Sequence, residues 1–127
     1  MVDVTPLVKE GQQIIQSYAG GRFRVSGLVY QGAVIIWPDR VLGWGFDGGL
    51  DDLSVSDFDA VTGAEDGLPD VVLLGCGAEM RFLPKELRLG LKEVGLNVEV
   101  MDTGAACRTY NVLMAEGRRV VAALLPF

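Results

Sequence analysis

The most informative absence in this 127-residue sequence is histidine, which does not occur at all. A histidine general base, a Ser-His or Cys-His catalytic pair and a histidine metal ligand are therefore excluded within this chain. The two cysteines, Cys76 and Cys107, lie far apart in the sequence and form no CxxC motif. Two thiols alone make a poor zinc site, so we expect neither a metal nor a cofactor.

Long hydrophobic runs and an excess of positive charge are also missing. No apolar run approaches the roughly 20 residues that a membrane-spanning helix needs, so we expect no membrane insertion. The formal net charge of −6 argues against nucleic-acid binding, because proteins that bind nucleic acid without sequence preference are normally basic. The N-terminus lacks a basic region followed by an apolar segment, which predicts a cytoplasmic protein.

What the sequence does contain is enough apolar material for one folded unit. Half of the residues are hydrophobic, and the length suits a single domain over residues 1–127. Residues 1–21 are predicted to form an N-terminal arm. Within it, Ile14, Ile15 and Tyr18 have a helix-like spacing, so a short helix and an ordered arm both remain open.

The segment from Pro69 to Phe127 organises the prediction. Val71 to Leu74 is a continuous apolar run, which is typical of a parallel central strand that is covered on both faces. Gly75-Cys76-Gly77 then forms a turn, and Pro84 opens a helix that continues to Val94.

The same strand–turn–helix unit is then repeated. Leu96 to Met101 is predicted as a strand, and a helix over Gly104 to Glu116 follows, capped by Asp102 or Thr103. Val120 to Leu125 is a further apolar strand. Two such units place two helix N-termini beside one edge of the sheet, where a working site is expected.

The first half of the chain is richer in strand patterns. Residues 22–27 alternate between polar and apolar side chains, and residues 33–46 read as a β-hairpin around Pro38-Asp39-Arg40. Trp37 and Trp44 flank that turn, either as an outward patch for a partner or as core residues. Residues 47–66 are acidic and loop-like, with one short helix possible after Ser54 or Ser56.

The predicted site at the sheet edge combines the glycine turn with the start of the second helix. Its residues are Gly75, Cys76, Gly77, Asp102, Thr103, Arg108, Thr109, Tyr110 and Asn111. In one interpretation they form a small polar pocket. In the other, they are a tight turn, a helix cap and a polar helix face. No residue is assigned as catalytic, although Cys76 could serve as a nucleophile with Asp102 or Glu79 as its base.

Several short motifs resemble a known family. They are Leu74-Gly75-Cys76-Gly77, Arg81-Phe82-Leu83-Pro84, Val100-Met101-Asp102-Thr103, Cys107-Arg108-Thr109-Tyr110-Asn111-Val112-Leu113 and Glu116-Gly117-Arg118-Arg119-Val120. Together they resemble the Mth938-domain family, a domain of unknown function that includes a mitochondrial assembly factor for respiratory complex I.

The resemblance implies a three-layer α/β fold, in which a central mixed sheet carries helices on both faces and an extra β-hairpin. It also implies a non-catalytic module that binds another protein, and links that module to the biogenesis of respiratory complex I. The alternative is a small-molecule-binding protein or enzyme that uses the polar pocket at the sheet edge. The oligomeric state is left open by the sequence.

Overall fold

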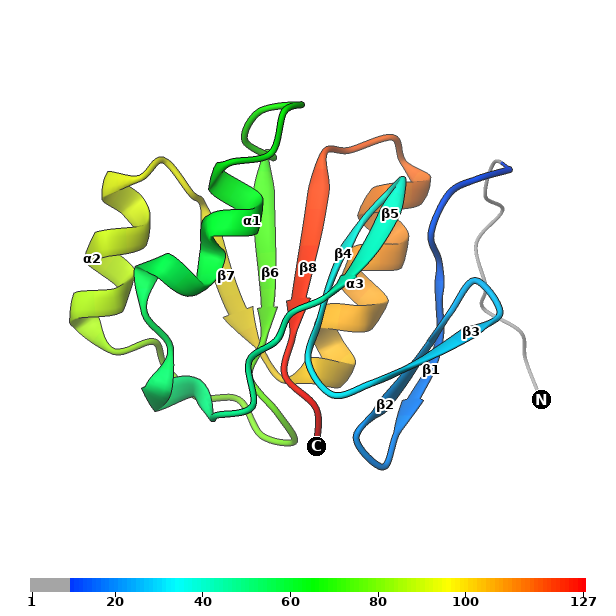
Figure 1. The fold of residues 1–127 in the computed structure, drawn as a ribbon, viewed down its shortest axis with the longest axis horizontal. Coiled ribbons are helices and arrows are strands. Elements are labelled where there is room, and N and C mark those ends of the chain that lie inside the picture. Colours follow the sequence, from blue (N-terminus) through cyan, green and yellow to red (C-terminus); the bar gives the residue numbers. More distant parts are fainter. Residues whose placement is uncertain (1–9) are drawn as a thin grey trace.

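Residues 10–127, which the computed structural model describes, form two β-sheets with helices packed against them (Figure 1). The strands are β1 (Ile15–Ala19), β2 (Arg22–Val25), β3 (Leu28–Gln31), β4 (Val34–Trp37), β5 (Arg40–Gly43), β6 (Val71–Gly75), β7 (Val98–Met101) and β8 (Val120–Leu124). The helices are α1 (Asp59–Thr62), α2 (Lys85–Glu93) and α3 (Thr103–Ala115), and two short 3₁₀ turns precede α1 at Leu50–Asp52 and Val55–Phe58.

The larger sheet is mixed, and β6 lies inside it with a neighbour on each side. Its strand order is β5-β4-β8-β6-β7, in which β6 runs parallel to both of its neighbours. The hairpin β4–β5 joins this sheet antiparallel to β8. The predicted parallel central strand and the predicted hairpin are therefore confirmed.

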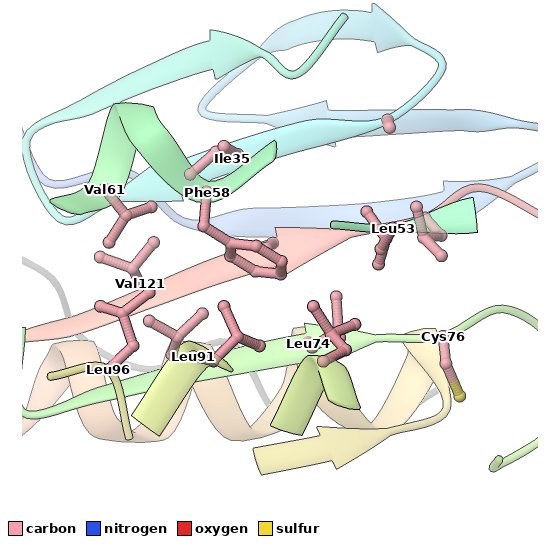
Figure 2. Packing of buried hydrophobic residues seen from close by; sticks show 14 of the residues in the cluster. Ile35, Leu53, Phe58, Val61, Leu74, Cys76, Leu91, Leu96 and Val121 are labelled. Atoms are coloured by element: carbon pink, nitrogen blue, oxygen red, sulfur yellow. The ribbon is translucent and has the colours of Figure 1, made fainter. Parts of the chain in front are cut away.

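Side chains of the central strands point alternately into two cores. Val72 and Leu74 of β6 pack with α1 and α2, as Figure 2 shows for Leu74. Val71 and Leu73 pack on the other face against α3 and the smaller sheet. Since both faces are covered, the sequence of β6 shows a continuous apolar run without alternation. This arrangement confirms the predicted three-layer α/β architecture with helices on both faces.

The smaller sheet has the order β1-β2-β3 and is formed by strands between residues 15 and 31. Residues 15–19 pair antiparallel with β2, so the helix that their spacing permitted is wrong. The side-chain amide of Asn111 in α3 fixes this strand, because it accepts from the backbone nitrogen of Ile15 at 2.9 Å and donates to its carbonyl at 2.8 Å. Residues 1–9 of the predicted arm lie outside the described residues.

The two longer helices begin and end at the expected signals. Pro84 immediately precedes α2, and Gly95 takes a left-handed conformation just beyond its end, with φ of 86°. Asp102 is the residue that caps α3, since its carboxylate accepts a hydrogen bond from the backbone nitrogen of Ala105 at 2.8 Å. This decides between the two predicted caps.

Both tryptophans face inward. Trp37 is buried, and the guanidinium of Arg40 lies over its ring at 4.1 Å from the ring centre. Trp44 is half-buried and donates its indole N–H to the carbonyl of Asp57 at 2.6 Å. Their rings also contact the core that α1 covers, so the alternative of an outward tryptophan patch is wrong.

Candidate functional site

The glycine turn and the start of α3 lie together, as the sequence predicts, and they are joined by direct hydrogen bonds. The hydroxyl of Thr103 accepts from the backbone nitrogen of Gly77 at 2.9 Å and donates to the carbonyl of Leu125 at 2.7 Å. The backbone nitrogen of Thr103 in turn donates to the carbonyl of Gly77 at 2.8 Å. Thr103 is fully buried and thus ties together the ends of β6 and β8 and the start of α3.

Gly75 is required by the close approach of these elements. A Cβ atom at this position would lie 3.0 Å from Thr103 Cα, Thr103 Oγ1 and Leu124 Cδ2. Contacts this short are tighter than about nine in ten of those that real Cβ atoms make, and both neighbouring residues, Thr103 and Leu124, are fully buried. Gly75 therefore allows α3 to pack closely against β6, as expected if Gly75-Cys76-Gly77 is a tight structural turn.

Cys76 lies beside the turn with little exposed surface. Its Sγ is 3.2 Å from the carbonyl of Glu79, to which the thiol donates. The guanidinium of Arg81 is engaged by Asp51 at 2.7 Å, and this hydrogen bond is the main cause that raises the pKa of Arg81. The thiol thus has a backbone acceptor as its partner, while Asp102, one predicted base, is occupied in capping α3.

Other predicted site residues on α3 face the smaller sheet instead of the glycine turn. Arg108 donates to the hydroxyl of Tyr18 at 2.9 Å, and the hydroxyl of Tyr110 donates to the carbonyl of Gln13 at 2.9 Å. Burial raises the pKa of Tyr110, with a smaller contribution from the charge of Asp39. Thr109 is half-buried on the same helix. Arg108 and Tyr110 thereby attach the N-terminal segment to α3.

Apart from Thr109, the predicted positions therefore divide into two structural groups. One group closes the turn around Thr103, and the other anchors β1 against α3 through Asn111 and Tyr110. A ligand pocket at this edge stays a prediction. The other cysteine, Cys107, belongs to the core on the α3 face, where burial raises the pKa of its thiol to about 12.

One hollow that the sequence did not indicate lies at the opposite end of the sheet. This cavity of about 230 Å³ is lined by the buried side chains of Trp37, Met114 and Val121 and by the exposed Arg118 and Arg119. It lies where β6 and β8 begin, whereas the predicted site lies where they end.

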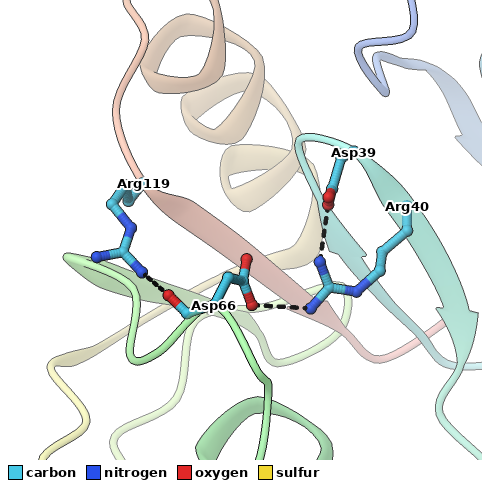
Figure 3. A network of polar contacts seen from close by, with 4 residues as sticks. All are labelled: Asp39, Arg40, Asp66 and Arg119. Carbon is cyan, nitrogen blue, oxygen red and sulfur yellow. Dashed lines mark hydrogen bonds and ion pairs between the residues drawn. The ribbon is translucent and has the colours of Figure 1, made fainter.

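The charged groups around this cavity are largely engaged with one another (Figure 3). Arg40 contacts Asp39 at 2.8 Å and Asp66 at 3.4 Å, and Arg119 donates to the backbone carbonyl of Asp66. The pKa of Asp66 is lowered, first by a backbone hydrogen bond and then by the hydrogen bond from Arg40. The network links the β4–β5 turn to the segment before β6, so its role is structural.

Two kinds of feature are absent from the described part of the chain, clusters of metal-ligating side chains and helices able to span a membrane. Within residues 10–127, no three Asp, Glu or Cys side chains come together in a group that could hold a metal ion. Every helix in the same range is too short or too polar to cross a bilayer.

The sequence is similar to proteins of one family along nearly its whole length. Residues 15–125 match the family described as Protein of unknown function (DUF498/DUF598). An uncharacterised protein of Rhodobacter capsulatus is 42% identical over 112 residues, covering 88% of this chain and 83% of that protein.

Two further relatives carry a functional name, NADH dehydrogenase (ubiquinone) 1 alpha subcomplex assembly factor 3. The protein from Danio rerio is 35% identical over 113 residues, which cover 89% of this chain and 64% of the relative. The protein from Homo sapiens is 31% identical over 112 residues, which cover 88% of this chain and 60% of the relative. The chain thus spans less than two thirds of the length of these assembly factors.

Solved structures show the same architecture. A crystal structure of a Bordetella parapertussis protein has a TM-score of 0.80 and 36% identity, covering 92% of this chain and 98% of that one. A solution structure of a Bordetella pertussis protein described as a Mth938-like domain has a TM-score of 0.76 and 30% identity, covering 98% of this chain and 92% of that one. The fold is therefore the Mth938-like α/β fold, which confirms the resemblance noted in the sequence. The chain belongs to the DUF498/DUF598 family of proteins of unknown function.

Proposed function

We propose that this protein is an assembly module for respiratory complex I, which acts by binding another protein and catalyses no reaction. The observation that carries the proposal is the similarity to assembly factor 3 of NADH dehydrogenase in several animals. The matched segments cover 88–89% of this chain, so the similarity extends over the whole folded unit and is not confined to one motif.

The surface beside the glycine turn supports a binding role. Phe82 is 86% exposed and Met80 is 48% exposed, although both are large apolar side chains in a short loop. The loop is held at Arg81 by its salt bridge to Asp51 and at Glu79 by the thiol of Cys76. An apolar side chain that is held outward in this way is typical of a residue that a partner covers.

The arrangement of polar groups supports the non-catalytic part of the proposal. A nucleophile needs a base within hydrogen-bond reach, yet Cys76 donates to a backbone carbonyl and the chain contains no histidine. The hydroxyls of Thr103 and Tyr110 are used to join elements of the fold. These groups stabilise the structure and are not free for chemistry.

Co-purification tests the partner-binding part directly. The tagged chain is expressed at its native level in the organism that encodes it, crosslinked in the cells and purified. We expect NADH dehydrogenase subunits, or their assembly intermediates, to be enriched over a preparation with the tag alone. Recovery of those subunits at the background level would contradict the proposal.

A further inference from the structure

The outer edge of β7 is an open edge of the larger sheet. Strand β7 is the last strand in the order, and among residues 10–127 it pairs with β6 alone (Figure 1). The carbonyl of Asn97 accepts a hydrogen bond from the backbone nitrogen of Val72 in β6, and the carbonyl of Met101 accepts one from Cys76, which directly follows β6. In a parallel strand, the backbone N–H and C=O groups of alternate residues point to opposite sides of the strand. The backbone groups of Val98 and Val100 therefore point away from β6, to the unpaired side. Open edges of this kind accept an added strand.

A groove between helix α2 and the start of β7 reaches this edge at Val98. Its volume is about 380 Å³. Leu83, Leu91, Leu96 and Val98 supply apolar side chains to its lining. An extended segment placed along β7 would therefore have apolar surface next to it in addition to main-chain partners.

The charge of the groove is opposite to that of the protein as a whole. Arg88 and Lys92 of α2 line it, and no carboxylate does so among the described residues. Lys85 lies three residues before Arg88 and seven before Lys92, so the three cations share one face of the helix. The chain nevertheless has 17 acidic and 11 basic residues, with a net charge of −6.

These cations are available to a partner. Within residues 10–127, the salt bridges involve Arg40 and Arg81, and neither Arg88 nor Lys92 takes part in one. Both side chains are exposed. Unpaired cations beside an apolar groove favour an occupant that carries both apolar and acidic side chains.

We propose that an extended acidic segment of the partner protein adds to the edge of β7 as a further strand. Its main chain pairs with Val98 and Val100, its apolar side chains enter the groove, and its carboxylates meet Arg88 and Lys92. The inference rests on the proposed function, since it names the surface and the kind of segment through which partner binding would occur.

A peptide probe tests the surface without knowledge of the partner. A labelled octapeptide of alternating glutamate and valine is titrated against the full chain, with fluorescence anisotropy as the readout. We expect saturable binding that weakens with salt, and amide NMR shifts centred on Val98 and Val100. The counterpart with lysine in place of glutamate, and the glutamate peptide with alternate N-methylated amides, should each bind at least about tenfold more weakly.

Two charge-reversed variants locate the site. R88E/K92E should weaken binding of the glutamate peptide by at least about tenfold. R22E/R24E is the matched control, because it changes the net charge by the same amount as R88E/K92E but at exposed positions of β2. This control should bind the glutamate peptide as the unaltered chain does. Both variants change exposed side chains, and their amide spectra show directly whether the fold is kept.

Four outcomes would overturn the inference, three of them in experiments on the purified chain and one in cells. The first is equal weakening by the two variants, which would mean unspecific charge attraction. The second is no binding at about 1 mM peptide, or shifts away from β7. The third is a dimer of the chain that R88E/K92E dissociates, which would make this edge a contact between two copies. If co-purification with NADH dehydrogenase subunits persists in R88E/K92E, the proposed function stands and this surface does not.

Discussion

Replacement of Thr103 by valine is expected to destabilise the protein strongly, although the two side chains have nearly the same shape. The hydroxyl accepts from the backbone nitrogen of Gly77 at 2.9 Å and donates to the carbonyl of Leu125 at 2.7 Å, and the residue is fully buried. Valine leaves both backbone groups without a partner. A buried polar group that loses its partner costs about 1–3 kcal/mol, so we expect the free energy of unfolding to fall by about 3 kcal/mol.

The assay is urea unfolding at neutral pH, followed by circular dichroism and by the fluorescence of Trp37 and Trp44. Thr103→Ser keeps the hydroxyl and loses one methyl group, so it should cost about 1 kcal/mol. Thr109→Val on the same helix is the matched control and should change the stability by less than about 0.5 kcal/mol. A Thr103→Val protein that is as stable as the serine variant would refute the account of how the turn is closed.

Two other predictions follow from how tightly α3 packs against its neighbours. Gly75→Ala should lower the free energy of unfolding in urea by about 1–3 kcal/mol, because the new Cβ would lie 3.0 Å from Thr103. Gly43→Ala is the control and should be near neutral, since a Cβ at that position has no atom within 4 Å. Equal effects of the two substitutions would contradict the packing role of Gly75. The stability should also fall as the pH rises above about 9. The folded-state pKa of Cys107 is raised from 9.0 to about 12 and that of Tyr110 is raised from 10.0, so the unfolded chain ionises first. Unfolding titrations between pH 8 and about 11 should show a smaller decline in Cys107→Ala, and an identical decline would refute the assignment.

The parts of the fold that the sequence predicts correctly are those in which one local pattern decides the outcome. The apolar run of β6 identifies a strand that is buried on both faces, and α2 has a proline before it, a glycine after it and a leucine stripe between them. Asp102 similarly marks the start of α3. In these segments, propensity, capping and hydrophobic spacing agree.

Strand β1 could not be predicted, because its stability comes from distant partners. The segment Ile15–Ala19 has no clear alternation, and it is fixed by pairing with β2 and by the amide of Asn111, 96 residues away. The same long-range contacts explain the fate of the predicted site. A donor-rich helix face suggests a ligand in the sequence, but in the structure Tyr110 and Asn111 bind the backbone of residues 13 and 15.

The α2–β7 groove has one signal that could have been read in advance. Lys85, Arg88 and Lys92 share one face of a helix in an acidic chain. What the sequence does not show is that β7 ends the sheet, since its apolar pattern equally suits a strand with two neighbours.

The measurement that tests the central claim most directly is the amount of fully assembled NADH dehydrogenase in cells that lack this gene. Membranes are separated by native electrophoresis and stained for NADH oxidation, with the unaltered gene returned as the control. The account predicts a loss of the assembled complex, or an accumulation of smaller assembly intermediates, that the returned gene reverses. A normal amount of the assembled complex in the deletion strain would contradict it.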